Sequence, residues 1–286
     1  MEQTASDSGA ERTRVGGIFE ERRGFSRLAN VDTWWLLVFA VLALIVALVR
    51  GKPQPFSEIF TFLSDGIFIT LRLTVVAFAF ILVVGMFGGL GRLARNPLLK
   101  GVSSLYVEVI RGIPLLVQLL FIWFALPQVL DAAGAWVAGL LPGVGQWLID
   151  VKMDPFAAAV LGFTICYGAY MSEIFRAGIQ SIHRGQMEAA RSLGMTYVQA
   201  MRHVILPQAV RVILPPVGNE FVTLLKDSSL VSVLAVPDLT RRGREYMART
   251  FLSFETWALV ALIYLVLTLT FTRLVAYIER RWSVGR

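Results

Sequence analysis

Long runs of apolar residues recur along the chain and set its predicted organisation. A helix needs roughly 20 mostly apolar residues to cross a hydrocarbon core of about 30 Å. Six runs come close to this length or exceed it, and they are Thr33–Val49, Gly66–Leu90, Ser104–Leu126, Pro155–Phe175, Gln208–Val236 and Phe254–Tyr277. The pattern therefore predicts six transmembrane helices.

Composition supports this prediction. Hydrophobic residues make up 56% of the chain and charged residues 16%, and the mean hydropathy is +0.65. Only helices and closed barrels satisfy every backbone hydrogen bond in lipid, and the apolar runs lack the alternation of barrel strands. We therefore expect an all-α integral membrane protein.

The distribution of Lys and Arg predicts its orientation. If the N-terminus is cytoplasmic, the inner segments near the spans carry 14 Lys and Arg and the outer segments seven. The positive-inside rule then places both termini in the cytoplasm. The last outer loop departs from the rule with four arginines between residues 241 and 249, for which the sequence offers no mechanism. The net charge of +7 suggests nucleic acid, but these basic residues lie at the ends of apolar runs, so no nucleic-acid partner is expected.

The longest inner loop contains a compact motif. It includes Glu188-Ala189-Ala190, then Gly194 and, nine residues later, Val204-Ile205-Leu206-Pro207. Glu-Ala-Ala favours a helix, Gly194 can end it, and Pro207 suits the start of the next helix. Two short helices joined by a glycine bend would fit a groove in a partner, whereas an ordinary amphipathic interfacial helix is the alternative.

This motif resembles the EAA loop of ABC importer permeases. In that family the loop docks into the ATP-binding subunit and passes its closure to the membrane helices. The resemblance thus implies an ATPase-coupling role for Glu188, Ala189, Ala190, Gly194, Leu206 and Pro207.

Further motifs are similar to the polar amino-acid branch of the same family. They are Tyr106–Gln118, Gly168–Ile179, Leu214–Glu220 and Lys226–Leu230. The resemblance implies a five-helix permease core with one extra N-terminal helix. The expected organisation is a polar cytoplasmic tail at 1–32, the extra helix and an outer loop at 33–63, and the permease domain at 64–286 with its coupling loop at about 180–207.

The energy source is expected on another chain. No Gly-x-x-x-x-Gly-Lys-Ser/Thr phosphate loop occurs, and Gly51-Lys52 is followed by Pro53. ATP and Mg are therefore assigned to a partner, and no cofactor is expected here. The resemblance implies two ATP-binding subunits, a second permease subunit of the same or a related chain and a solute-binding protein, assembled in the lipid of the bacterial inner membrane.

Polar residues in or beside the spans are candidates for a substrate pathway, because ionisable groups in hydrocarbon are costly and usually paired or functional. The pathway candidates are Gln118, Glu173, Asn219 and Glu220. Glu173 with Arg176 could instead form a helix-stabilising pair. Structural ion pairs are also expected between Glu108 and Arg111 and between Lys226 and Asp227.

Glycine and proline patterns within the spans bear on helix packing, and two other functions compete with that of a permease. The glycines between Gly85 and Gly91 fit either a dimer seam or packing within the chain. Five prolines, Pro114, Pro127, Pro155, Pro215 and Pro216, are each expected to kink or end a helix, and the paired prolines make the fifth span the best candidate for a broken helix. An intramembrane enzyme is disfavoured because no His-Glu-x-x-His or Gly-x-Ser-x-Gly occurs, so no catalytic or metal site is expected. An ion-coupled secondary carrier for small polar solutes is the alternative, although two related halves are not visible.

Overall fold

The computed structural model describes residues 33–51 and 53–283, and this part of the chain is helical with short connections and no strand. The α-helices are α2 (Thr33–Gly51), α3 (Pro53–Leu93), α4 (Pro97–Gly112), α5 (Leu115–Leu120), α6 (Leu126–Ala138), α7 (Pro142–Asp150), α8 (Pro155–Gln180), α9 (Arg184–Ser192), α10 (Tyr197–Ala200), α11 (Leu206–Asp227), α12 (Leu239–Thr250) and α13 (Ser253–Ser283). Two π-helical segments, η1 (Phe121–Ala125) and η2 (Met201–Ile205), and the 3-10 helix η3 (Ser228–Leu234) lie between them. The predicted all-α fold is confirmed, while the predicted tail at 1–32 lies outside the described residues.

Five helical stretches in the described residues are long and apolar enough to cross a membrane. They are Trp34–Gly51, Gln54–Leu93, Leu115–Ala138, Pro155–Gln180 and Ser253–Arg281. They correspond to five of the six predicted spans, with shifted ends. The remaining predicted span falls on α11, which is long but less apolar. The total of six crossings therefore stays a prediction.

The third predicted span is broken. α4 ends at Gly112, Ile113 is extended with φ −108° and ψ 131°, and helix resumes at Leu115. The ring of Pro114 disfavours the helical conformation of the residue before it, which accounts for the break. The predicted span over Ser104–Leu126 is thus interrupted at Pro114, one of the prolines expected to kink or end a helix, and the apolar crossing segment begins at Leu115.

The fifth predicted span also differs. α11 continues through Pro215 and Pro216 and ends at Asp227, after which the chain tightens into η3 and turns at Ala235 with φ 68°. The interruption therefore lies at Asp227 and not at the paired prolines. Membrane helices tolerate proline where local adjustments satisfy the freed carbonyl groups.

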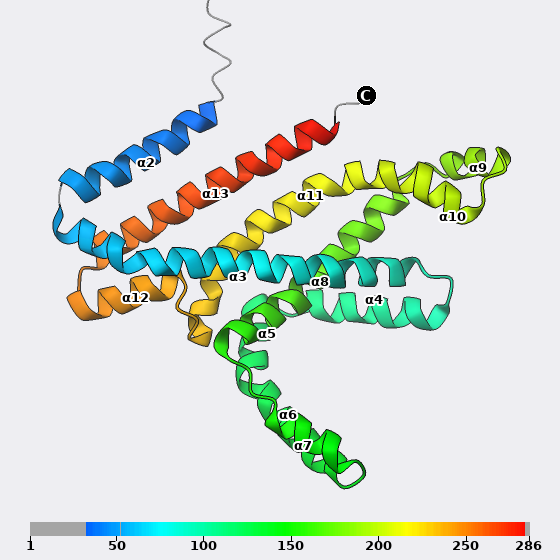
Figure 1. Ribbon diagram of the computed structural model, residues 1–286, viewed down its shortest axis with the longest axis horizontal. Coiled ribbons are helices and arrows are strands. Elements are labelled where there is room, and N and C mark those ends of the chain that lie inside the picture. The colour runs from blue at the N-terminus through cyan, green and yellow to red at the C-terminus, as the bar shows by residue number, and fades with distance from the viewer. Residues whose placement is uncertain (1–32, 52, 284–286) are drawn as a thin grey trace, which may run out of the picture.

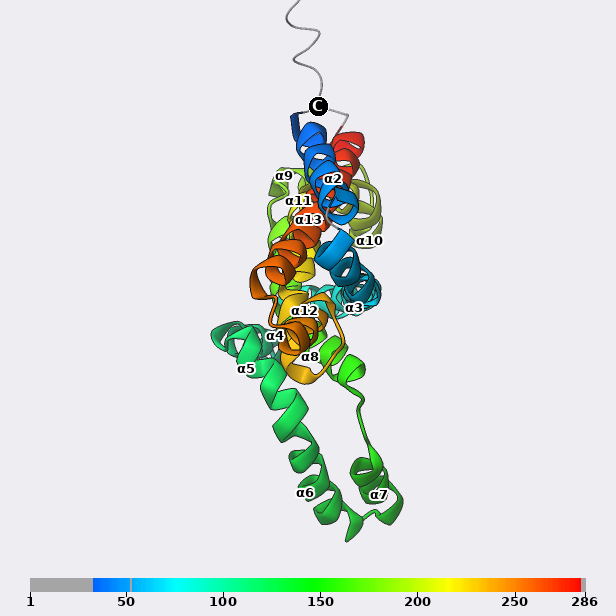
Figure 2. The same ribbon diagram turned by 90° about the vertical axis from the view of Figure 1, so that its left-hand side faces the viewer.

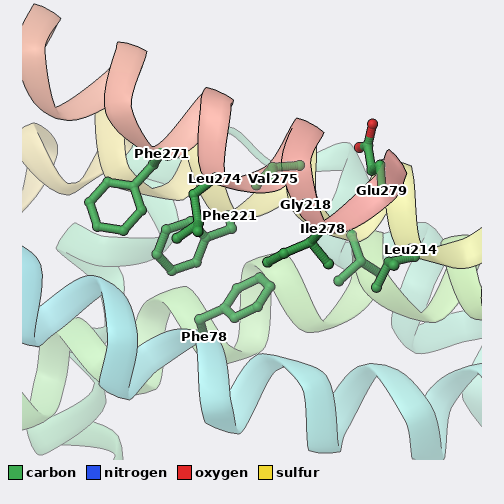
Figure 3. A pocket seen from close by; sticks show the side chains of 10 residues that line it. Phe78, Leu214, Gly218, Phe221, Phe271, Leu274, Val275, Ile278 and Glu279 are labelled. Atoms are coloured by element: carbon green, nitrogen blue, oxygen red, sulfur yellow. The ribbon is translucent and has the colours of Figure 1, made fainter. Parts of the chain in front are cut away.

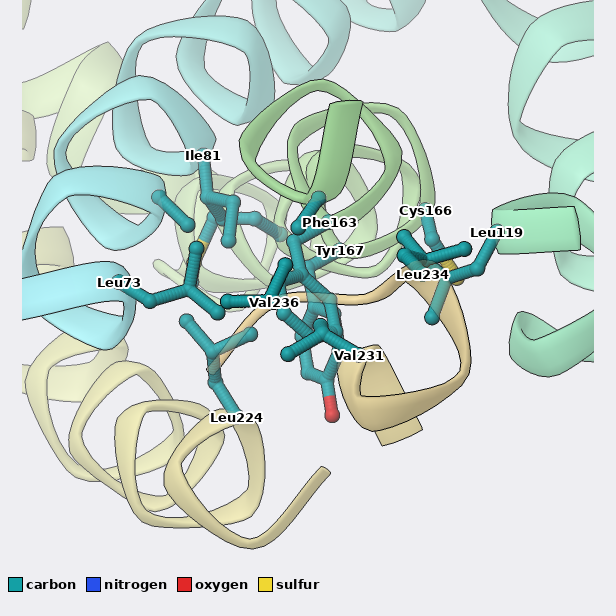
Figure 4. Close-up of a cluster of buried hydrophobic side chains, with 13 residues drawn as sticks. Leu73, Ile81, Leu119, Phe163, Cys166, Tyr167, Leu224, Val231, Leu234 and Val236 are labelled. Carbon is teal, nitrogen blue, oxygen red and sulfur yellow. The ribbon is translucent and has the colours of Figure 1, made fainter. Parts of the chain in front are cut away.

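α3 and α8 cross in the middle of the molecule and form its core (Figure 1). Figure 4 shows side chains of α3, α8, α11 and η3 meeting there, with Phe163 and Leu73 fully buried. A Cβ atom at Gly85 or Gly88 would collide with α8. Helices associate in lipid through such close packing, so these two glycines serve packing within the chain.

The extra N-terminal helix α2 lies alongside α13 (Figure 1). Its residues Val38, Val41 and Ile45 are buried. The ring of Trp34 lies 4.8 Å from the guanidinium carbon of Arg273 on α13. α2 is thus packed onto the bundle along its length.

The basic outer loop of the sequence is the helix α12, packed against α3. Arg242 forms ion pairs with Asp65 and Glu245, and Arg241 pairs with Glu245 at 2.9 Å. Arg244 donates to Ser232 Oγ at 3.2 Å. Asp65 and Glu245 thus offset the charge of two of the four arginines, Arg241 and Arg242, within the chain.

Helices α6 and α7 form a hairpin that projects from the bundle (Figure 2). Gly134 and Gly145 let the two helices approach, because a Cβ on either would collide with the opposite helix. The hairpin exposes large apolar side chains, among them Trp136 and Trp147.

Candidate functional site: the coupling helices and a polar cluster

The predicted coupling loop forms two short helices at one end of the molecule, where Figure 1 shows α9 and α10 projecting beyond α11. The imidazole of His183 caps α9 by accepting from the Gly185 amide at 3.1 Å. Thr196 and Gln199 form a reciprocal capping box at the start of α10. Both helix starts are therefore satisfied by side chains of the loop itself.

Gly194 makes the turn between these helices. It has φ +86°, a conformation that costs L residues with a side chain about 1–2 kcal/mol. Its amide donates to Arg191 O at 3.0 Å, and the Met195 amide donates to Ala190 O at 3.2 Å. These bonds satisfy carbonyl groups at the end of α9, so the predicted glycine bend is present.

The outer surface of the two helices combines polar and apolar groups. Glu188 and Ala189 are exposed while Ala190 is 4% exposed and faces the protein. Leu193 is 81% exposed and Val198 70%, although large aliphatic side chains favour burial. The motif did not single out these two residues. Their position on either side of the glycine turn, Leu193 at the end of α9 and Val198 in α10, is the signal that could have found them.

At the other end of the coupling segment, η2 leads directly into α11. Leu206 begins α11 and Pro207 lies in its first turn, as predicted. Because proline has no amide hydrogen, the preceding turn widens to π-helical geometry. The helix α10 is therefore continuous with α11 through η2.

A polar cluster lies among α4, α8 and α11. Tyr167 Oη donates to Asp227 Oδ2 at 2.6 Å. Glu220 is half-buried and interacts electrostatically with Asp227 and with Arg111. The guanidinium carbon of Arg111 lies 5.0 Å from the ring centroid of Tyr170. Carboxylate, guanidinium and phenol groups thus lie close together, with Tyr170, Glu220 and Asp227 half-buried and Arg111 exposed.

This arrangement differs from the expected ion pairs. Among the described residues, neither Glu108 with Arg111 nor Lys226 with Asp227 forms a salt bridge, since Arg111 and Asp227 face other partners in the cluster. Tyr167 is not among the predicted site residues, although its phenol in an apolar helix needs a hydrogen-bond partner. Asn219 lies next to Glu220 on α11 and is exposed.

Gln118 lies at the break between α4 and α5. Its Nε2 donates to Ile110 O and Ile113 O, both at 2.8 Å, and so adds a donor at the end of α4, where Ile110 O also accepts from the Ile113 amide at 3.4 Å. The side chain is buried, and its Oε1 has no hydrogen-bond partner in the described structure. These contacts favour a structural role, and its predicted place in the pathway stays a prediction.

Glu173 lies near the end of α8 that leads to α9. Its carboxylate pairs with Arg92 of α3 and with Arg176 of α8. The pair with Arg176 agrees with the helix-stabilising alternative, while Arg92 adds a link between two helices. A pathway role for Glu173 stays a prediction, but both of its oxygens are occupied by arginines.

An apolar pocket separate from the polar cluster opens among α3, α11 and α13 (Figure 3). Figure 3 shows Phe78, Phe221 and Phe271 pointing towards one another across it. None of the predicted pathway residues lines it, and it offers a polar solute few partners. The polar cluster is therefore the better candidate for contact with a polar substrate.

Comparison with known proteins identifies the family. Residues 81–284 match the family described as binding-protein-dependent transport system inner membrane component. The chain belongs to this family. The permease is 38% identical over 222 residues to the glutamine transport system permease protein GlnP of Escherichia coli (strain K12), covering 78% of this chain and 93% of GlnP. It is 37% identical over 227 residues to the L-cystine transport system permease protein TcyB of Bacillus subtilis (strain 168), covering 76% and 88%.

Solved structures agree with this assignment. The permease is similar to a chain in the crystal structure of an amino acid ABC transporter with histidines, with 40% sequence identity, a TM-score of 0.66 and coverage of 83% of this chain and 98% of that chain. A chain of the inward-facing MetNI methionine ABC transporter shares the fold at 20% identity, with a TM-score of 0.61 and coverage of 79% and 98%. The resemblance drawn from the motifs is confirmed, and the permease is a transport subunit rather than an enzyme. Nothing in the comparisons favours an ion-coupled carrier.

Proposed function

We propose that this permease forms the translocation path of an ATP-driven importer for a polar amino acid. The polar cluster of Tyr167, Asp227, Glu220 and Arg111 carries the proposal, because it brings both signs of charge together beside α8 and α11. A free amino acid carries an ammonium and a carboxylate, and these two groups match such a site. Relatives named for glutamine and cystine transport support the same substrate class.

Coupling to ATP is assigned to the surface of α9 and α10. Glu188 and Ala189 are exposed there, with the apolar side chains of Leu193 and Val198 beside them. A separate ATP-binding subunit, carrying ATP and Mg, would receive this surface in a groove. Its closure would reach the polar cluster through α10, η2 and α11, which form one continuous helical path. The remaining partners are a second permease chain, a solute-binding protein and inner-membrane lipid.

The test reconstitutes the complete complex in liposomes with its solute-binding protein and measures ATP-dependent uptake of radiolabelled amino acids. We expect uptake of at least one polar amino acid, saturable and dependent on ATP. Glu188→Lys should abolish most of that uptake while the permease still inserts. Glu279→Lys is the control, because it makes the same charge change away from α9 and α10. Equal uptake by the wild type and Glu188→Lys would contradict the coupling assignment.

A further inference from the structure

The helix α12 lies at the opposite end of the molecule from α9 and α10 (Figures 1 and 2). If α9 and α10 meet the ATP-binding subunit in the cytoplasm, α12 faces the outside of the cell. Its buried residues Leu239, Gly243 and Tyr246 recur at intervals of three and four and lie on the side packed against α3 and α13. Arg244 and Ala248 lie on the opposite face and are exposed.

The residue that ends α12 is Phe251, and its backbone is left-handed with φ 59° and ψ 14°. Glycine is the usual residue at such a helix end, and a bulky residue in this conformation is an outlier. The ring of Phe251 is 86% exposed, so packing within the described chain does not account for a phenylalanine there. Phe254, at the start of α13, is 79% exposed. Two phenylalanine rings thus project from one surface turn, one of them at a position that glycine would suit better.

Two exposed arginines of α12 lie near this turn and are held by neutral groups. Arg244 donates to Ser232 Oγ at 3.2 Å, and the guanidinium carbon of Arg249 lies 5.3 Å from the ring centroid of Phe62. Among the residues that the structure describes, neither arginine forms an ion pair, in contrast to the other two arginines of α12. Aromatic residues and arginine are the types enriched where proteins bind one another.

A polar depression beside α12 distinguishes a soluble partner from lipid. It lies between the beginning of α3 and α12, with a volume of about 600 Å³. Its lining on α3 includes the hydroxyl groups of Ser57 and Thr61 and the exposed carboxylates of Glu58 and Asp65. Hydrocarbon would leave these groups without partners, and anionic headgroups would be repelled by the carboxylates. The surface around α12 therefore faces water, and a polar protein is the partner that fits it.

We propose that Arg244, Arg249, Phe251 and Phe254, here called the α12 surface, bind the solute-binding protein together with the adjoining depression. The family is described by its dependence on a binding protein, which supplies a soluble partner on the outer side. That partner presents an apolar recess to Phe251, carboxylates to the two arginines and polar side chains to the depression. The inference rests on the proposed function, in which the solute-binding protein delivers the amino acid.

Binding of the cognate solute-binding protein to the complete complex in nanodiscs, followed by biolayer interferometry, tests the proposal. Phe251→Gly removes the ring and also relieves the left-handed strain. The midpoint of thermal unfolding should stay close to that of the wild type, because relief of strain offsets the greater freedom of glycine in the unfolded chain. The affinity for the solute-binding protein should nevertheless fall about 5- to 30-fold, the loss expected for an aromatic side chain central to an interface. Phe87→Ala is the control, because this ring is also exposed but lies on the apolar span of α3, and it should change the affinity less than twofold.

Charge and lipid are tested separately. Arg244→Gln with Arg249→Gln should slow association and weaken its dependence on salt, whereas lysine at both positions should restore the rate. Ala248→Cys labelled with bimane reports what covers the surface, since the native Cys166 is buried. Its emission should shift to shorter wavelength when the solute-binding protein is added. The same shift on transfer from detergent to nanodiscs alone would assign the surface to lipid and overturn the proposal.

Uptake measurements separate this surface from the proposed function. Excess solute-binding protein should restore uptake by Phe251→Gly but not by Glu188→Lys, because only the first variant is limited by docking. Equal affinity of the wild type and Phe251→Gly would overturn the α12 surface and leave the proposed function in place. Failure of the solute-binding protein to bind the wild-type complex would overturn both.

Discussion

The Tyr167 hydroxyl donates a 2.6 Å hydrogen bond to Oδ2 of Asp227, although 60 residues separate the two in the chain. Figure 4 shows the ring of Tyr167 in the apolar cluster and its oxygen pointing out of that cluster. The bond joins the central helix α8 to the last residue of α11, where the α-helix changes to η3. It therefore holds the end of α11 and the position of a carboxylate beside the candidate pathway.

Replacing Tyr167 by phenylalanine should destabilise this junction. The change removes the donor while leaving the ring, and a partly buried carboxylate without its partner costs about 1–3 kcal/mol. We expect a lower midpoint of thermal unfolding in detergent and slower amino-acid uptake in liposomes. Tyr170→Phe, one turn along α8, keeps the ring beside Arg111 and loses no hydrogen bond of the described structure, so it should remain near wild type. An unaltered midpoint in Tyr167→Phe would mean that the bond contributes nothing to stability.

A second prediction concerns the left-handed turn at Gly194. Gly194→Ala should cost about 1–2 kcal/mol in the coupling turn, because the strain arises from φ +86° and not from crowding. We expect weaker retention of the ATP-binding subunit during affinity purification, together with reduced uptake. Gly101→Ala is the control, since a methyl group there also meets open space but at an ordinary φ. Full retention of the ATP-binding subunit by both variants would show that the left-handed turn at Gly194 is not needed for its binding.

The sequence was sufficient to predict much of the fold, because lipid imposes length and hydropathy on each span. Hydropathy alone does not show the break at Ile113, since an apolar run continues across it, but Pro114 was expected to kink or end a helix there. The restriction that Pro114 places on Ile113 was the available signal. Pro215 and Pro216 predicted a break that is absent, because α11 continues through both prolines.

The candidate site, like the fold, was predicted only in part from the sequence. Gly194 was predictable from the local motif, because a helix end followed by glycine is a short-range pattern. The convergence of Arg111, Tyr167 and Asp227 depends on how α4, α8 and α11 pack. Spacing along the chain suggested that Arg111 and Asp227 pair with nearby residues. Their observed partners are on another helix, because Asp227 accepts from Tyr167 and Arg111 lies over the ring of Tyr170, both on α8. Long-range packing of this kind is not encoded in a local motif.

A third prediction tests the pathway itself. Asn219→Ala and Glu220→Gln should each raise the substrate concentration for half-maximal uptake, because both groups adjoin the polar cluster. A direct hydrogen bond to a charged ligand contributes about 1.5–3 kcal/mol, so a shift of roughly tenfold or more is expected. Complex assembly should be unchanged by size-exclusion chromatography. Glu279→Gln, the same chemical change in the apolar pocket, provides the control. Wild-type uptake kinetics in both pathway variants would indicate that the substrate contacts lie on other helices.

A fourth prediction follows from Asp238, which is fully buried and caps α12 by accepting from the Thr240 and Arg241 amides. Burial raises the pKa of this carboxyl from 3.8 to about 6. The folded state therefore binds a proton more readily than the unfolded state between these values, so protonation stabilises the fold as the pH falls. Tyr264 Oη, 3.4 Å from Oδ2, is the nearest titratable group across the packing interface.

Asp238→Asn keeps a capping side chain but cannot titrate. Relative to this variant, the wild type should gain about 1 kcal/mol of stability between pH 7.5 and pH 5. Thermal unfolding in detergent at a series of pH values measures the difference, and the comparison with the variant cancels the titration of other groups. A difference that is constant with pH would exclude Asp238 as the titrating group.

The last prediction concerns topology, which cysteine labelling can test because the chain contains one cysteine. Its single cysteine, Cys166, is buried, so it should not react with a membrane-impermeant maleimide. Gly143 on the projecting hairpin and Gly101 on α4 are exposed, and an added side chain meets open space at both. Gly143→Cys should be labelled in intact spheroplasts, and Gly101→Cys only in inverted membrane vesicles, because the predicted orientation places them on opposite sides. Labelling of Gly101→Cys in intact spheroplasts would reverse the orientation. Labelling of both from one side would show that the segment between them does not cross the membrane, which would exclude Leu115–Ala138 as a span.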